Sequence, residues 1–302
     1  MYLIRQNKGD SNIYLQVNSR WYRYDCSLSP VGEGAMGSVY LGFDCVSNEK
    51  VAVKVLRQEY WDDVHMRMRL KLEASIQVSH PNLIRMIGFC EDASGKGPLF
   101  VLSEYVCGVT LEEHMHYSAY WNTRERCDKI VGEFLPLLGA VSCLHYYGII
   151  HRDIKPSNIM FQDGCNLKLM DLGIAKADHF FDAHLKGFIG TMPFAAPEQC
   201  VEDDVEADLD VTADIYAIGV TLSYLLVNHF PITKYDKIPK SLSEIVRKAT
   251  MTDRDARFRS AGEMRHALED YISYGSRYNV SVKGWIVMSI LLAVLVLFVL
   301  IL

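Results

Sequence analysis

The segment from His151 to Asn158 constrains this chain more than any other stretch of its sequence. It reads His-Arg-Asp-Ile-Lys-Pro-Ser-Asn, so that Lys155 lies between Asp153 and Asn158. A carboxylate in such a loop can orient a hydroxyl group and accept its proton. A lysine beside it can face a migrating phosphoryl group, and an asparagine oxygen can bind a magnesium ion. One such octet could arise by chance, so its weight depends on the rest of the chain.

Three further motifs stand in a fixed order around this octet. A glycine-rich turn at residues 32–37 and a Val-Ala-Val-Lys run ending at Lys54 precede it, and Asp171-Leu172-Gly173 follows it. A lone Gly-x-Gly-x-x-Gly is weak evidence. Here it lies between two predicted strands, which favours a hairpin that covers phosphates over a dinucleotide-binding turn. Its glycines allow close approach of the backbone to phosphates. Four motifs in this order and spacing are typical of protein kinases.

Lys54 would be a point charge for the α- and β-phosphates of a nucleotide. A lysine in a partly buried site needs a carboxylate partner. The long helix predicted after it offers Glu73 near its middle, whereas Glu59 lies too close to the helix start. We therefore predict a Lys54–Glu73 ion pair.

The apolar pattern predicts strands in the first part of the chain and helices after it. A small hairpin is expected where alternating apolar residues precede Asn18-Ser19. Strands are expected at 22–31, 38–44, 50–57, 83–90 and 99–106. Helices are expected at 58–79, 124–147, 212–227, 242–250 and 261–271. The predicted fold class is α+β, with a strand-rich lobe, a helical lobe and a cleft between them.

The carboxyl end differs from the rest of the chain. Residues 285–302 are apolar apart from Ser289, and about 18 residues form a helix of ~27 Å, just long enough to cross a bilayer core. A buried core helix is the alternative, but such helices normally carry a polar stripe. Arg277 and Lys283 precede the run, so the positive-inside tendency places the preceding domain in the cytoplasm. The predicted division is a 1–21 extension, a 22–274 catalytic domain, a 275–284 juxtamembrane linker and a 285–302 transmembrane helix.

Charge and cysteine spacing disfavour several classes of function. The formal net charge of -6 argues against a nucleic-acid-binding surface. None of the 8 cysteines forms a Cys-x-x-Cys pair, which disfavours a zinc site or a redox pair and is typical of free thiols in a reducing compartment. The amino terminus lacks the apolar run of a signal peptide. No feature of the sequence specifies an oligomeric state.

With these motifs in view, residues 22–274 resemble the bacterial Hanks-type (eukaryotic-like) Ser/Thr protein kinases. The resemblance implies Asp153 as catalytic base, with Lys155 on the γ-phosphate. It implies ATP as cosubstrate and magnesium as metal, with manganese as an alternative, held by Asn158 and Asp171. The residues that it implies for the nucleotide site are Val31, Gly32, Glu33, Gly34, Gly37, Val39, Ala52, Lys54, Glu73, Glu104, Val106 and Met160.

The same resemblance implies a hinge at Glu104-Tyr105-Val106 that binds adenine through its backbone, with Ser103 at the gatekeeper position. It implies a substrate-side loop at residues 190–198, whose Thr191 contacts the catalytic Asp and Lys. Three structural roles also follow from it. Glu198 pairs with Arg257, Asp214 anchors the catalytic loop, and a regulatory spine includes His151, Leu172 and Met86.

Three positions depart from the pattern of that family. Gln77 falls where the spine usually has an apolar residue, which either weakens packing behind Glu73 or reflects a shift in alignment. Residues 231–241 are shorter than the corresponding family segment. The segment 172–190 contains no Ser, Thr or Tyr that could be phosphorylated. Arg152, which often pairs with a phosphate there, is then expected to meet an acidic side chain instead, either Asp178 or Asp182.

The sequence predicts a membrane-tethered Ser/Thr protein kinase with protein substrates. A pseudokinase or scaffold on the same fold is the main alternative, but Lys54, Asp153 and Asp171 are all present. A small-molecule kinase on the same fold is a second alternative. The loop at residues 190–198 favours a protein substrate over it, because in the resembled family that loop seats a peptide.

Overall fold

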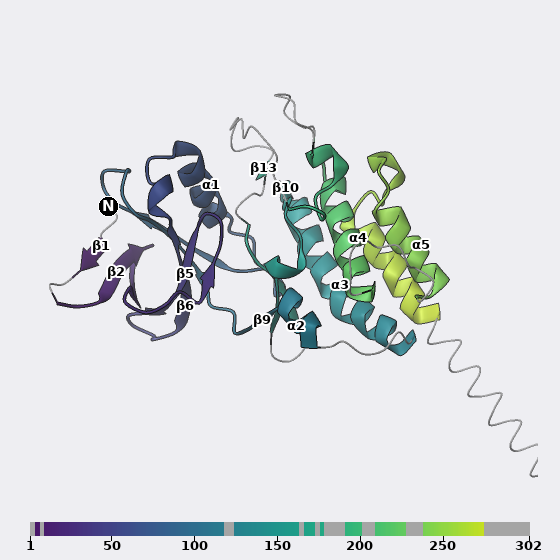
Figure 1. Ribbon diagram of the computed structural model, residues 1–302, viewed down its shortest axis with the longest axis horizontal. Coiled ribbons are helices and arrows are strands. Elements are labelled where there is room, and N and C mark those ends of the chain that lie inside the picture. The colour runs from purple at the N-terminus through teal and green to yellow at the C-terminus, as the bar shows by residue number, and fades with distance from the viewer. Residues whose placement is uncertain are drawn as a thin grey trace, which may run out of the picture.

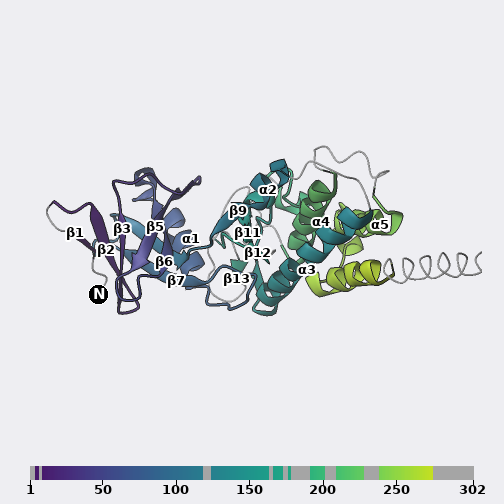
Figure 2. The ribbon, with the colours of Figure 1, turned by 90° about the horizontal axis from the view of Figure 1, so that it is seen from below.

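The computed structural model shows two lobes joined side by side (Figure 1). It describes residues 4–6, 9–117, 124–162, 166–172, 176–177, 191–200, 209–227 and 238–274. Strands β1–β8 and one helix form the first lobe, and helices α2–α5 form the second. Figure 2 shows the strands β9, β11 and β12 between the amino-terminal lobe and the larger helices. The predicted two-lobed α+β architecture is confirmed.

An antiparallel sheet builds the first lobe, in the order β1-β2-β3-β5-β6-β8-β7, with β4 paired to β5. Its alternating side chains bury a small core of aliphatic and aromatic residues that includes Leu15, Tyr24 and Val53. The strands are β1 (Ile4–Gln6), β2 (Asn12–Val17), β3 (Arg20–Asp25), β4 (Gly32–Glu33), β5 (Gly37–Asp44), β6 (Lys50–Leu56), β7 (Met86–Glu91) and β8 (Leu99–Glu104).

The hairpin predicted at the amino end is present, and it belongs to this sheet. Asn18 and Ser19 connect β2 to β3 with φ values of 48° and 65°. Positive φ at both positions is what a two-residue hairpin turn needs in order to match the twist of its strands. Asn18 Nδ2 also donates to the Ile87 carbonyl (2.8 Å) on β7. The division expected between residues 21 and 22 therefore falls inside β3.

Several predicted elements are longer than the observed ones. The strand expected at 83–90 begins only at Met86, and the strand expected at 99–106 ends at Glu104. The strand expected at 22–31 ends at Asp25, and the helix expected at 58–79 is the short 3-10 turn η1 (Gln58–Tyr60) followed by α1 (Val64–Ser75). The side chain of Asp63 accepts hydrogen bonds from the first backbone N–H groups of α1, which sets its start. After Ser75 the backbone becomes extended at Ile76, a β-branched residue with modest helix propensity.

The second lobe surrounds a buried helix. Twelve of the residues of α4 (Thr212–Val227) are buried, as its apolar density predicts. The other helices are α2 (Leu111–Tyr117), α3 (Arg124–Tyr146), α5 (Lys240–Ala249) and residues 261–274. The short strands are β9 (Gly108–Thr110), β10 (Ile149–Ile150), β11 (Ile159–Gln162), β12 (Asn166–Leu169) and β13 (Lys176–Ala177). Single 3-10 turns are η2 (Pro156–Asn158), η3 (Pro197–Gln199) and η5 (Arg254–Ala256).

No helix in the ranges described above is both long and apolar enough to cross a membrane. The predicted linker at 275–284 and the predicted span at 285–302 lie outside those ranges.

Candidate active site

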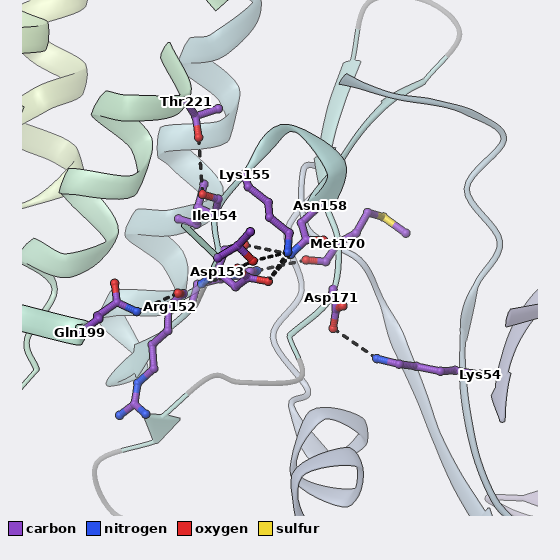
Figure 3. Close-up of polar contacts among 12 residues, drawn as sticks. Lys54, Arg152, Asp153, Ile154, Lys155, Asn158, Met170, Asp171, Gln199 and Thr221 are labelled. Carbon is purple, nitrogen blue, oxygen red and sulfur yellow. Dashed lines mark hydrogen bonds and ion pairs between the residues drawn. The ribbon is translucent and has the colours of Figure 1, made fainter. Parts of the chain in front are cut away.

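An ion cluster joins the two lobes at Lys54. Its Nζ lies 3.2 and 3.0 Å from the two carboxylate oxygens of Glu73 on α1, as the sequence predicts, and 3.3 Å from Asp171 Oδ1. Figure 3 shows Lys54 reaching from β6 toward Asp171, which follows β12. Burial opposes the charge of Lys54, but the Asp171 and Glu73 carboxylates outweigh it and raise the pKa of this lysine. The ammonium therefore stays charged and is held in place for a phosphate.

The glycine-rich turn is a tight hairpin above this cluster. Val31 N–H donates to Val39 carbonyl (2.8 Å), and Gly34 N–H donates to Gly37 carbonyl (2.9 Å). A Cβ at Gly37 would lie 2.3 Å from the Val55 carbonyl oxygen, so only glycine fits at that position. Val39 is opposite Lys54 in the β5–β6 register. Four other residues predicted at the nucleotide lie on three strands: Gly32 and Glu33 on β4, Ala52 on β6 and Met160 on β11.

The predicted hinge leaves the sheet at the end of β8. Ser103 is opposite Ala52 on β6 and Met86 on β7. The side chain of Glu104 accepts from Arg85 N–H (2.9 Å), just before β7, and from Lys168 Nζ (2.5 Å) on β12. The Glu104 N–H donates to the Arg85 carbonyl (2.9 Å), so the end of β8 is tied to the start of β7 through both backbone and side chain. Val106 is buried against the main core.

The loop between β10 and β11 brings Asp153, Lys155 and Asn158 together (Figure 3), and Thr191 contacts them from the loop at residues 190–198. Asn158 Nδ2 donates to Asp153 Oδ2 (2.9 Å), and Lys155 Nζ lies 2.9 Å from the same oxygen. Thr191 Oγ1 donates to Asp153 Oδ1 (2.8 Å) and accepts from Lys155 Nζ (2.6 Å). Both carboxylate oxygens of Asp153 are thus held by donors, which fixes the carboxylate in one orientation.

Asn158 and Asp171 are suited to share a cation. The amide nitrogen of Asn158 is occupied by Asp153, which leaves its amide oxygen for a metal. Met170 N–H donates to the Asn158 carbonyl (2.8 Å), and this bond places the next residue, Asp171, beside the loop. The side chain of Asp171 is 42% exposed, and the backbone at this residue has a positive φ of 50°. Magnesium is commonly bound by one or two side-chain oxygens together with substrate phosphates, and this donor set fits it.

A buried carboxylate supports the catalytic loop from below. Asp214 on α4 is fully buried and accepts from His151 N–H and Arg152 N–H, each at 2.8 Å. His145 Nε2 lies 2.8 Å from its second oxygen. Burial would raise the pKa of Asp214, but the His145 and Arg152 bonds and the nearby histidines lower it below its usual value. Asp214 stays ionised and holds Arg152 at its strained φ of 70°.

Comparison with known sequences agrees with this geometry. The sequence model of the protein kinase domain matches residues 27–277. The chain belongs to the protein kinase family. Serine/threonine-protein kinase PknB of Mycobacterium leprae is 31% identical over 261 residues, covering 78% of this chain and 41% of that protein. Probable serine/threonine-protein kinase PknB of Lactococcus lactis is 29% identical over 262 residues, covering 78% of this chain and 40% of that protein.

The kinase domain therefore has bacterial Ser/Thr kinases as its relatives, and the chain spans about two fifths of the length of those curated proteins. A solved structure shows the same fold. The Mycobacterium tuberculosis PknI kinase domain superposes with a TM-score of 0.64 at 24% sequence identity, covering 82% of this chain and 95% of that one.

A buried ion pair holds the end of the loop at residues 190–198, which the sequence predicts to lie on the substrate side. Arg257 is 2% exposed and binds Glu198 in two parallel hydrogen bonds of 2.6 and 2.8 Å. Its remaining donors go to backbone carbonyls, including that of Thr212 at the start of α4. Bidentate pairs of this kind have defined geometry. The predicted Glu198–Arg257 pair is present and links the end of the loop at residues 190–198 to α4.

Three of the residues predicted for the regulatory spine are buried as expected, and Gln77 is not. His151, Leu172 and Met86 are buried, and His151 Nε2 lies 3.1 Å from the Met170 carbonyl. Gln77 lies beyond the end of α1, is exposed, and lines a cavity of about 350 Å³. Because α1 ends at Ser75, Glu73 is near the carboxyl end of the helix and not near its middle, yet its pairing with Lys54 is intact.

Some predictions fall on residues that the structure does not describe. Gly190, Asp178 and Asp182 are among them, and so is most of the segment 231–241. The acidic partner expected for Arg152 therefore stays a prediction.

Sequence reasoning missed several residues that support the site. His145 contacts Asp214. Gln199 Nε2 donates to the Arg152 carbonyl (3.0 Å), and Thr221 Oγ1 donates to the Ile154 carbonyl (3.5 Å). Figure 3 shows Gln199 and Thr221 reaching the catalytic loop from the helical lobe. Each is a single polar residue with no motif of its own. Only its burial beside the loop distinguishes it from a surface residue.

Ser103 leads to the first testable prediction. Because its side chain is small, an ATP-site inhibitor with a bulky group behind the adenine position should bind the native chain. Ser103→Phe should weaken that binding about 10- to 100-fold by overpacking the pocket, measured by calorimetric titration. Ser103→Ala is the matched control and should bind the inhibitor like the native chain. Equal affinity for the native and Phe forms would show that the position of the hinge or of the pocket is wrong.

Proposed function

We propose that this chain transfers the γ-phosphoryl group of ATP to serine and threonine hydroxyls of protein substrates. The observation that carries the proposal is the closed set of contacts among Asp153, Lys155, Asn158 and Thr191. Across the lobes from it stands the Lys54–Glu73 pair. These residues suffice for positioning and charge neutralisation, which carry most of the catalysis in phosphoryl transfer.

Each residue has a distinct role in the proposed reaction. Lys54 binds the α- and β-phosphates, and Glu73 holds it in place. Asp153 accepts the proton of the attacking hydroxyl, while Lys155 faces the γ-phosphate. Asn158 and Asp171 would hold a magnesium ion, which neutralises charge on the phosphates when it is bound.

The hydrogen bonds to Asp153 support its role as base. Thr191 and Asn158 each bind one of its carboxylate oxygens, so the carboxylate cannot rotate away from an incoming hydroxyl. Thr191 belongs to the loop that ends in the Glu198–Arg257 pair, which ties substrate seating to the position of the base. A protein substrate is favoured over a small molecule for this reason.

The direct test is transfer of label from γ-labelled ATP to proteins of a cell lysate by the purified chain. A pseudokinase would bind nucleotide without transferring label above the level of a protein that lacks Asp153.

We further propose that residues 285–302 tether the kinase domain to a membrane, with the domain in the cytoplasm. The support is the length and apolar character of that segment, together with Arg277 and Lys283 before it. The linker at 275–284 would then connect the two parts.

Membrane tethering gives the second testable prediction. The full chain should sediment with membranes, resist extraction by high salt and be released by detergent, because apolar burial is insensitive to ionic screening. Deletion of residues 285–302 should move the protein to the soluble fraction with kinase activity within about twofold of the full chain, since no catalytic motif lies in that segment. A full chain that salt alone extracts would contradict the tether. Digestion of the kinase domain by protease added to intact cells would reverse the orientation.

A further inference from the structure

Helix α1 carries Glu73 but has a small apolar contact face. Its four buried residues are Arg67, Leu70, Glu73 and Ala74, so two of the four are charged. Helices in proteins are normally held by an apolar stripe along one face. Just beyond the carboxyl end of the helix, Gln77 is exposed and adds nothing to the core. The position of α1 must therefore depend strongly on its buried charges.

Arg67 makes the most extensive of these contacts. It is 5% exposed, and its Nη1 donates to the Gly97 carbonyl (2.6 Å) and the Trp61 carbonyl (3.1 Å). Its Nη2 donates to Glu91 Oε2 on β7 at 2.8 Å. Three acceptors from three separate segments thus converge on one guanidinium group. The planar fork of arginine suits such a site, whereas a single point charge does not.

The partners of Arg67 connect α1 to the strand that carries Lys54. Trp61 lies between the two elements, and its Nε1 donates to the Leu56 carbonyl (3.1 Å) at the end of β6. Leu56 is two residues beyond Lys54 on that strand. The contacts therefore run from β6 through Trp61 to Arg67, and along α1 to Glu73. They cross-link the two elements that meet at the Lys54–Glu73 pair.

Glu91 is an ionised partner in this network. Lys71 Nζ lies 2.7 Å from its second oxygen. Burial opposes ionisation of Glu91, but the bonds from Lys71 and Arg67 lower its pKa below the usual value. Withdrawal of α1 from β7 would leave buried charges without partners, which is strongly unfavourable.

We propose that Arg67 is a positioning residue that holds α1 where Glu73 meets Lys54. The inference rests on the proposed kinase function for its catalytic consequence. The brace formed by Arg67, Glu91, Trp61 and Gly97 lies wholly within the strand-rich lobe. Contacts within this one lobe therefore hold Glu73 where it can pair with Lys54.

The test uses the full chain in detergent and three variants. Arg67→Met keeps an unbranched apolar stem but removes the guanidinium group and with it all three hydrogen bonds. Glu91→Gln keeps the shape of the acceptor but removes its charge. Lys71→Met is the matched control, because Lys71 binds the other oxygen of Glu91, is 35% exposed and reaches neither Trp61 nor Gly97.

The first measurement does not depend on kinase activity. Lys54 is acylated with an amine-reactive reagent in the absence of nucleotide, and the rate is followed by mass spectrometry. When Glu73 moves away, the Lys54 amine loses two of its hydrogen-bond contacts and becomes more accessible to the reagent. Arg67→Met should raise the rate about tenfold, the factor for about 1.4 kcal/mol. Glu91→Gln should raise it severalfold and Lys71→Met less than about twofold. Glu73→Gln gives the upper limit of the Lys54 acylation rate, because it removes the carboxylate partner directly.

The second measurement separates positioning from general damage. In Arg67→Met, kcat should fall about tenfold. KM for the protein substrate should stay within twofold, because the loop proposed to seat that substrate is anchored to α4 in the helical lobe. Hydrogen exchange of the α1 amides should quicken, with exchange in α4 unchanged.

A folded Arg67→Met protein, judged by circular dichroism, whose Lys54 acylation and kcat stay within twofold of the native values would overturn the inference. If that variant does not fold, Glu91→Gln decides by the same criterion. A native chain without kinase activity would refute the proposed function, yet Lys54 acylation would still decide the role of Arg67.

Discussion

Asp153→Asn should lower kcat by about two to four orders of magnitude, which is the usual contribution of a positioned acid–base group. The amide keeps the shape of the carboxylate but cannot accept a proton from the substrate hydroxyl. The ion pair with Lys155 is lost, while the hydrogen bond from Thr191 can be retained. ATP affinity should change little, because Asp153 acts on the hydroxyl during transfer. Initial rates with γ-labelled ATP, together with nucleotide titration, measure both quantities.

Asp270→Asn provides the control for this experiment. Asp270 is an exposed carboxylate on the helix at residues 261–274, away from the catalytic loop. Its replacement makes the same chemical change and should leave kcat unaltered. Equal rates for the native and Asp153→Asn proteins would favour the scaffold or pseudokinase alternative.

Lys54→Met should lower kcat/KM for ATP by about two to three orders of magnitude, the range for removing one preorganised charge or donor from a reaction centre. Methionine fills much of the same volume, so the fold should survive in a site where Lys54 is only 17% exposed. The Glu73 carboxylate loses its partner but can become neutral by protonation, since burial raises its pKa to about 7 even beside Lys54.

A double variant sharpens this second prediction. In the proposed mechanism the role of Glu73 is to hold Lys54, so adding Glu73→Gln to Lys54→Met should cost little more than Lys54→Met alone. Steady-state kinetics of the single and double variants give the coupling directly. Fully additive losses would show that Glu73 acts independently of Lys54, contrary to the contacts in the structure.

The chemical residues of the site could be predicted from sequence because they lie in short motifs. Asp153, Lys155 and Asn158 share one loop, so their proximity follows from local geometry alone. The pairing of Lys54 with Glu73 required an inference across two elements, and it succeeded because a buried lysine needs a carboxylate.

The supporting residues could not be predicted in this way. Arg67 lies in a stretch rich in Arg and Lys, where a charge normally indicates a solvent-exposed helix face. Its burial depends on Glu91 at the end of β7 and on Gly97 in the turn between β7 and β8. His145 likewise depends on Asp214, far along the chain. Contacts of this kind belong to the tertiary structure and leave no periodic signal.

Helix boundaries show the same limit. The absence of Gly and Pro between residues 58 and 79 predicted one long helix, but capping by Asp63 and burial of Ile76 divide that stretch. Local propensity is weak enough for such tertiary contacts to override it.

The hairpin at the amino end has a practical consequence for the expression of a minimal kinase fragment. The family match begins at residue 27, and a cut at residue 22 would look natural from the motifs. Such a cut would divide β3 and remove Leu15 and Val17, which are buried in the core of the strand-rich lobe. Each lost side chain represents about 1.5–3 kcal/mol of apolar burial, a large share of the stability of an ordinary domain. A truncated enzyme of that kind would aggregate or unfold for reasons unrelated to catalysis, so the first strands should be retained in any shortened form.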